Sequence, residues 1–234
     1  MRFVSLICVA SMLAALRAAA GDTRSIVHAL EQRYHSATTL SAVFLERYSD
    51  GNGAATAESG TVYFSRPGRM RWDYESPKQK LFLVDGKNAW FYVPADHTAS
   101  RAKINESSDW RTPLALLAGK ADLSQLCRDI QLVDPHAPGA KSEDAPLSAD
   151  DSVLRCVPRG ESNSQAAAEQ TVLLEADSEA HLVRVVIHEP GGVVTEFRFG
   201  NWQENIAIPE VKFHFQVPPG VAIVDEQSLA GAIH

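Results

Sequence analysis

One arginine, Arg66, stands at the end of an apolar segment and directly before a proline, which ends a strand. Residue alternation places it in the same register as Val62 and Phe64. A guanidinium group has five hydrogen-bond donors, and it is costly on an apolar face unless those donors find acceptors. The pattern predicts a polar anchor that binds backbone carbonyls of a covering helix or loop. The alternative is that Arg66 emerges into solvent at the strand end.

Large apolar side chains occupy both registers of the predicted strands 61–66, 69–75 and 88–93. An antiparallel sheet with one face in water alternates more cleanly. One interpretation is an ordinary core on both sides of the sheet. The other is a curved sheet whose concave face is covered by helices, with room for an apolar ligand. The side chains concerned are Val62, Phe64, Met70, Trp72, Tyr74, Trp90, Phe91 and Tyr92.

Catalytic and metal-binding patterns are missing from the sequence. It contains no G-x-S-x-G, H-E-x-x-H, phosphate-binding or dinucleotide-binding motif. The eight histidines show no ligand spacing, and His181 and His188 stand at opposite ends of one predicted strand. We therefore expect a protein that is not an enzyme and has neither a metal site nor a cofactor.

The first twenty residues have the pattern of a secretory signal peptide. Arg2 precedes an apolar run from Phe3 to Leu16, and the small residues Ala18-Ala19-Ala20 follow. The alternative is a membrane anchor, but the run is shorter than the ~20 apolar residues that a bilayer requires. We expect residues 21–234 to form a single exported domain.

The charge of the exported chain is acidic. The whole chain has 22 Lys and Arg against 29 Asp and Glu, so loss of Arg2 and Arg17 leaves 20 against 29, a net charge of −9. Nucleic acid and anionic membrane surfaces are poor partners for such a chain.

Two cysteines follow the predicted cleavage site. Cys8 lies inside the signal peptide, and bulky Ile7 before it argues against lipid attachment. Cys127 and Cys156 would lie in an oxidising compartment, which favours a disulfide. The alternative is two buried thiols that never meet, because a disulfide requires favourable local geometry.

The periodicity predicts a mainly β protein. One amphipathic helix is expected over 23–37, followed by a period of two from Leu40 to Tyr48 and a short apolar helix within 110–119. The segment 134–152 is expected to be a mobile loop and 160–168 a polar hairpin tip. Because the strands are short and separated by turns, we expect one antiparallel meander. The further strands are predicted at 61–66, 69–75, 80–84, 88–93, 99–104, 128–133, 152–158, 170–176, 181–189, 193–200 and 211–217.

Two blocks of residues carry a family resemblance. The first comprises Gly60, Arg66-Pro67, Trp72, Asp85-Gly86-Lys87, Trp90-Phe91-Tyr92 and Pro94, and the second Asn205, Phe213, Phe215, Pro218-Pro219-Gly220-Val221 and Asp225. With these blocks the chain resembles the periplasmic outer-membrane lipoprotein carrier proteins, the LolA family. Thr112-Pro113-Leu114 falls where the lid helix of that family begins.

The resemblance implies an unclosed antiparallel β-barrel, a curved sheet of about eleven strands, with an α-helical lid. Such carriers are monomers that take acylated lipoproteins from an inner-membrane lipoprotein-releasing ABC transporter to an outer-membrane receptor. Arg66 would be the lid latch, and Met70 replaces a family phenylalanine that is implicated in cargo transfer. The expected acyl cavity is lined by Val62, Phe64, Met70, Trp72, Leu114 and Leu117.

Some residues depart from the family pattern. Val93 precedes Pro94 where asparagine is frequent, His97-Thr98 follow, and the loop 134–152 is long. These departures concern the surface that faces partners more than the fold. The alternative function is a lipid-sensing regulatory or other lipid-binding periplasmic protein on the same fold.

Overall fold

The computed structural model describes residues 22–104, 114–117, 119, 122–140, 142, 145–159 and 170–226. The predicted signal peptide (residues 1–20), the predicted hairpin tip (residues 160–168) and residues 110–113 of the predicted lid lie outside the described residues. In the helix at 114–117, the side chains of residues 114 and 115 also lie outside them.

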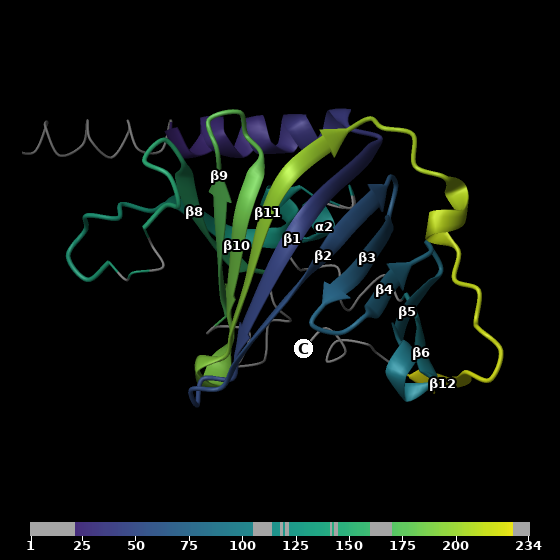
Figure 1. Cartoon of the computed structure of the whole chain (residues 1–234). Helices are drawn as coiled ribbons and strands as arrows, with labels where there is room; N and C mark the ends of the chain where they lie inside the picture. Colours follow the sequence, from purple (N-terminus) through teal and green to yellow (C-terminus); the bar gives the residue numbers. More distant parts are fainter. Residues whose placement is uncertain are drawn as a thin grey trace, which may run out of the picture.

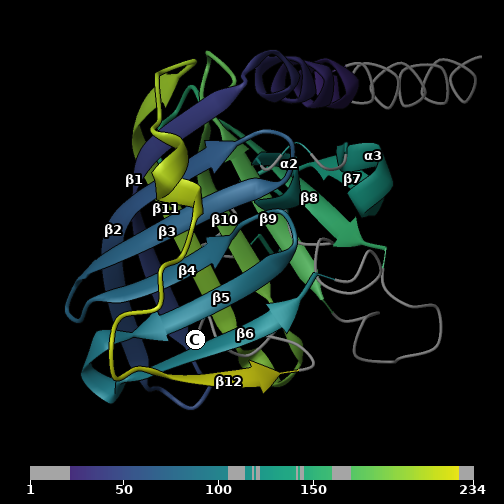
Figure 2. The same cartoon turned by 90° about the vertical axis from the view of Figure 1, so that its right-hand side faces the viewer.

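The described residues form one curved sheet of twelve strands, in the order β12-β6-β5-β4-β3-β2-β1-β11-β10-β9-β8-β7. Its two end strands, β12 and β7, are not paired with each other, so the barrel is unclosed (Figures 1 and 2). The first six strands are β1 (Thr39–Ser49), β2 (Ala55–Ser65), β3 (Arg69–Ser76), β4 (Lys80–Val84), β5 (Asn88–Val93) and β6 (Thr98–Lys103). The others are β7 (Cys127–Leu132), β8 (Ser152–Pro158), β9 (Thr171–Ala176), β10 (Leu182–His188), β11 (Val194–Glu204) and β12 (Ala222–Glu226).

The expectation of one continuous meander is wrong, because the strands form two meanders. β1 to β6 follow one another across one half of the sheet, and β7 to β11 across the other. The halves join where β1 pairs with β11 in an antiparallel register from Leu40↔Glu204 to Ser49↔Val194. Both strands have eleven residues, and this long pairing between distant segments gives no local signal in the sequence.

The predicted strand at 211–217 is also wrong. These residues belong to a segment, residues 206–221, that crosses the outer face of the sheet and is called here the C-terminal strap (Figure 2). It includes the 3₁₀ helix η4 (Glu210–Phe213), which follows Pro209, and it ends near Pro218 and Pro219. Proline cannot donate to a strand ladder, so apolar alternation here serves packing rather than pairing. After the strap, β12 pairs in parallel with β6.

The strap explains why both registers of β4 and β5 are apolar. The same expectation for β3 is wrong, because its large apolar side chains all share the inward register and the outward register is charged. The inward side chains of β4 and β5 join the main core, whereas Leu81, Leu83 and Trp90 point outward. On the outer face they pack against Phe213, and partly buried Tyr92 belongs to the same group. Both faces of this part of the sheet are therefore covered, the outer one by the strap.

The helix over residues 22–36 lies across one end of the sheet (Figure 1, purple). Leu30 and Tyr34 on one of its faces are fully buried. The Tyr34 hydroxyl accepts a hydrogen bond from the backbone N–H of Leu182 at 2.7 Å, and its ring packs edge-on against Trp202. This helix agrees with the one predicted at 23–37 to within one residue at each end.

The described part of the loop between β7 and β8 is anchored to the outer face of β9 and β10. The Arg184 guanidinium bonds Glu175 at 2.5 Å and donates to the carbonyl of Ala145 at 2.8 Å. Leu147 donates its backbone N–H to Glu175. A buried ion pair thus holds part of a loop that the composition predicts to be mobile.

Short helical turns connect the remaining elements. α2 (Leu114–Leu117) and α3 (Leu123–Leu126) precede β7, and η1 (Pro94–Asp96) and η3 (Pro190–Gly192) lie in turns between strands.

Candidate functional site

The side chains between the two halves of the sheet form one apolar interior. Val62, Phe64, Met70 and Trp72, all expected in the acyl cavity, belong to one buried cluster and are at most 5% exposed. Trp72 is central among them, because its ring contacts four phenylalanines of β1, β2 and β11 edge-on. The ring centroids lie 4.8 Å from Phe44, 6.3 Å from Phe64, 5.4 Å from Phe197 and 6.1 Å from Phe199.

α2 lies at one end of this interior, behind the sheet in Figure 1. Leu116 and Leu117 are fully buried and belong to the same cluster as the strand residues. The side chain of Leu114, also expected to line the cavity, lies outside the described residues. The described part of the predicted lid therefore contributes two leucines to the interior.

Arg66 joins the sheet to α2. Arg66 directly follows Ser65, the last residue of β2. Its guanidinium donates to the carbonyl of Leu116 at 2.9 Å and to the carbonyl of Leu117 at 3.2 and 3.3 Å. These acceptors are terminal carbonyls of a short helix, which have no partner inside the helix. Partial burial lowers the pKa of Arg66 from its ordinary value, yet a guanidinium remains charged.

Gly119 lets the arginine approach this closely. Its φ is +68°, and a Cβ atom at this position would lie 2.8 Å from the Arg66 Cδ. Any side chain there would collide with the arginine and would also strain the backbone. The contact between Arg66 and the end of α2 thus depends on a glycine.

A polar group inside the interior was missed by the sequence reasoning. Glu46 is 2% exposed, and its carboxylate accepts a hydrogen bond from the Tyr74 hydroxyl at 2.7 Å. Burial raises the pKa of Glu46 from 4.5 to about 7, and the nearby Glu58 adds to this effect. A signal was present, because Glu46 stands in the same alternating register as the apolar Ala42 and Phe44.

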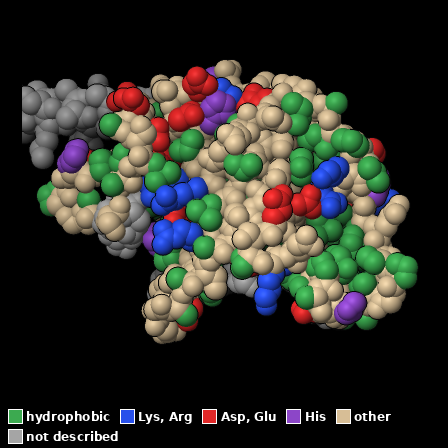
Figure 3. Space-filling model, viewed as in Figure 1, with side chains coloured by type: hydrophobic (Ala, Val, Ile, Leu, Met, Phe, Trp, Pro, Cys, Tyr) green, Lys and Arg blue, Asp and Glu red, His purple; other side chains and the backbone are tan. Residues whose placement is uncertain are grey.

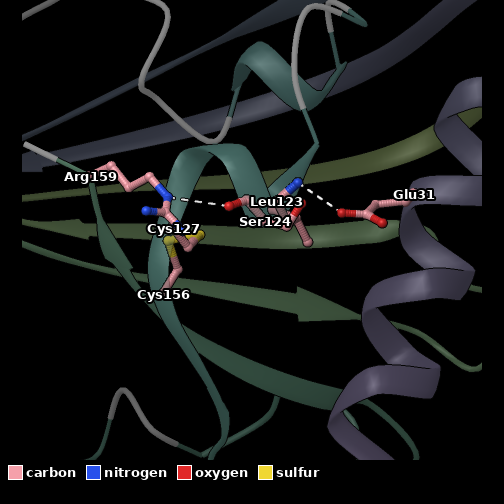
Figure 4. The surroundings of a disulfide bond; sticks show 6 residues. All are labelled: Glu31, Leu123, Ser124, Cys127, Cys156 and Arg159. Atoms are coloured by element: carbon pink, nitrogen blue, oxygen red, sulfur yellow. Dashed lines mark hydrogen bonds between the residues drawn. A yellow bond between two sulfur atoms is a disulfide. The ribbon is translucent and has the colours of Figure 1, made fainter.

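The two cysteines form a disulfide across the β7–β8 pair, with Cα atoms 5.5 Å apart. The bond lies next to α3, which is held from two sides (Figure 4). Glu31 on the helix 22–36 accepts the backbone N–H of Leu123 at 2.9 Å, and Arg159 donates to the carbonyl of Ser124 at 3.2 Å. The disulfide and these bonds hold α3 in place before β7.

The outer face has a separate hollow of about 470 Å³ between the strap and strands β3 to β5. It is lined by charged and polar groups, among them Arg71, Asp73 and His214, together with Phe215. None of the residues expected in the acyl cavity lines it. Figure 3 shows apolar side chains along this side of the molecule, where the strap and β12 run.

Within the described ranges, no three His, Cys, Asp or Glu side chains come close enough to hold a metal ion. Over the same part of the chain, no helix is long and apolar enough to cross a membrane.

A family model described as outer membrane lipoprotein carrier protein LolA matches residues 35–138, a segment that includes β1 to β6, α2 and the strand β7. A relative from Nitrosospira multiformis is named outer-membrane lipoprotein carrier protein. It is 27% identical over 203 residues, which cover 86% of this chain and 88% of the relative's length. A second relative with the same name, from Methylobacillus flagellatus, is 27% identical over 227 residues, which cover 97% of this chain and the full length of the relative. Over residues 35–138 the chain is similar to the LolA family.

The part matched by the LolA model contains Arg66, the carbonyls that it bonds and the four strand residues of the interior. Among solved structures, a LolA superfamily protein from Nitrosomonas europaea has a TM-score of 0.43 and 12% identity, covering 82% of this chain and 97% of that one.

Proposed function

We propose that this protein is a periplasmic carrier of acylated lipoproteins. Support comes from its similarity to the LolA family and from an apolar interior closed at one end by α2. The cargo would come from a lipoprotein-releasing ABC transporter of the inner membrane and go to a receptor at the outer membrane. Residues 1–20 would be the signal peptide that exports the chain, and residues 21–234 a single carrier domain that acts as a monomer.

The observation that carries the proposal is the set of hydrogen bonds from Arg66 to Leu116 and Leu117. They hold two buried leucines of α2 against the interior. Acyl chains would enter when these bonds break and α2 moves away. Val62, Phe64, Met70, Trp72, Leu114 and Leu117 would then contact the chains.

The energetics require such a latch. Each CH₂ group that leaves water contributes ~0.8 kcal/mol, so several long chains together would bind too tightly for release. Breaking the Arg66 bonds and exposing the leucines of α2 offsets part of this gain, because the loaded state then lacks these contacts. No covalent step is involved.

Two experiments test the proposal. Native mass spectrometry of protein isolated from periplasm should find acylated lipoprotein bound to a fraction of the molecules; protein that never carries acylated material would contradict the carrier function. In a transfer assay with purified membranes, Arg66→Leu should accept cargo but release it more slowly than wild type. An Arg66→Leu variant that transfers at the wild-type rate would remove the latch role while leaving the carrier function intact.

A further inference from the structure

We propose that Glu46, Glu58, Tyr74 and Lys80, called here the polar floor, limit the length of the acyl chain that the interior accepts. The inference rests on the carrier function proposed above and deepens it. The geometry points to saturated acyl chains that end before they reach this group of side chains.

The four side chains come from four consecutive strands and lie on the inward face. Glu46 on β1 stands opposite Glu58 on β2, and Tyr74 on β3 stands opposite Lys80 on β4. Tyr74 donates to Glu46 at 2.7 Å, and Lys80 is paired with Glu58. The Lys80 ammonium also lies 4.6 Å from the centroid of the Tyr74 ring. Contacts between strands therefore join all four residues into one network.

The polar floor lies at the end of the interior opposite to α2. Arg66, which bonds α2, follows the last residue of β2, whereas Glu58 is near the beginning of that strand. Glu58 precedes Phe64 by six positions, which corresponds to roughly 20 Å at about 3.3 Å per residue. The side chains between these two levels on β1, β2 and β3 are Ala42, Phe44, Val62 and Trp72, all apolar.

This order of layers sets a limit on chain length. A chain that enters below α2 stays in apolar surroundings until it reaches Phe44 and Trp72, and each added methylene tightens binding by about fourfold. Beyond that level the chain end would separate Glu46 from Tyr74. A buried hydrogen bond would be lost and a carboxyl group left without a partner, so further methylenes would no longer increase affinity.

The chain offers a matched pair of variants. Glu46→Met with Tyr74→Phe removes both partners of the bond, keeps similar side-chain volumes and leaves no buried polar group unpaired. Glu46→Gln keeps a polar group of the same shape and serves as the control. Urea unfolding curves establish that each variant is folded before binding is measured.

The experiment measures the affinity of the full exported chain for N-acylcysteine peptides with decanoyl, lauroyl, myristoyl, palmitoyl, stearoyl and arachidoyl chains. For wild type and Glu46→Gln, the affinity should increase with the length of the acyl chain and then stop increasing, at the same chain length in both proteins. In the double variant the increase should continue for at least one further member, two methylenes longer, with about sixteenfold tighter binding there. If the double variant stops at the wild-type length, the polar floor sets no limit.

A second measurement uses the wild-type protein only and does not depend on how a variant folds. A palmitoyl peptide with a photoreactive diazirine at the chain end should label the layer of Phe44, Trp72 and Tyr74. Labelling of the β1–β2 turn at residues 50–53, beyond the polar floor, would overturn the inference. Wild type that binds no peptide of any length would instead contradict the carrier function itself and with it the inference.

Discussion

Trp90 on β5 and Phe215 on the C-terminal strap pack with their ring centroids 5.2 Å apart, on the outer face of the sheet. Phe213 fills the centre of the same apolar group and is 1% exposed. Charged contacts border it, since Arg71 donates to the carbonyl of Lys212 at 3.0 Å. The outer face of β4 and β5 thus has a core of its own, separate from the interior.

Phe213→Ala should destabilise the protein by about 3–5 kcal/mol, because it removes the largest buried side chain that the strap places on the sheet. Urea unfolding followed by tryptophan fluorescence measures the change. Val211→Ala is the matched control within the strap, since Val211 is 63% exposed and its loss should change stability by no more than about 0.5 kcal/mol. Equal effects of the two variants would show that the strap does not pack as described.

Arg66→Leu should release the end of α2. Hydrogen bonds to a charged group contribute about 1.5–3 kcal/mol, so backbone amides in residues 114–119 should exchange hydrogen at least about tenfold faster. Hydrogen exchange read by mass spectrometry measures this, and amides of β9 and β10 should be unaffected. Arg66→Lys should give an intermediate rate, because a single ammonium lacks the forked donors of the guanidinium. Unchanged exchange in Arg66→Leu would mean that packing alone holds α2.

Glu46 should make stability depend on pH between 4.5 and about 7. Its pKa is raised in the folded protein by burial, so the folded state binds a proton that the unfolded state releases. Stability from this group is fully present below pH 4.5 and is lost as the pH increases through about 7, by up to about 3 kcal/mol. The reason is that deprotonation places a charge among apolar side chains.

The measurement is the urea midpoint of wild type and of Glu46→Gln over this pH range. Burial also raises the pKa of Glu175, so only the difference between the two proteins reports on Glu46. The difference should shrink or disappear at low pH and grow as the pH rises. Parallel profiles would contradict the assignment.

Removing the disulfide with Cys127→Ser and Cys156→Ser should cost about 3–4 kcal/mol, because the bond closes a loop of 29 residues in the unfolded chain. Calorimetry of the double variant against the oxidised wild type measures this. Reduced wild type provides the control and should behave like the double variant. If oxidised wild type is no more stable than either, the two cysteines are not joined in solution.

Local patterns were sufficient for most strands. β4, β5 and β8 have the bounds that alternation and turn residues predict, because these signals act between near neighbours in the sequence. The strap was predicted as a strand because Phe213 and Phe215 alternate as strand residues do. Alternation reports which side chains are buried, and it does not report whether the backbone finds a partner strand.

The sequence by itself determined the class of fold, the position of Arg66 at a strand end and the presence of excess apolar surface. Only the tertiary structure decided which register faces the interior, that β1 pairs with β11, and that Arg66 reaches the carbonyls of α2. It also decided that Glu46 is enclosed with Tyr74. These relationships join residues far apart in the chain, and they depend on how a curved sheet brings distant strands together, for which a single sequence contains no local signal.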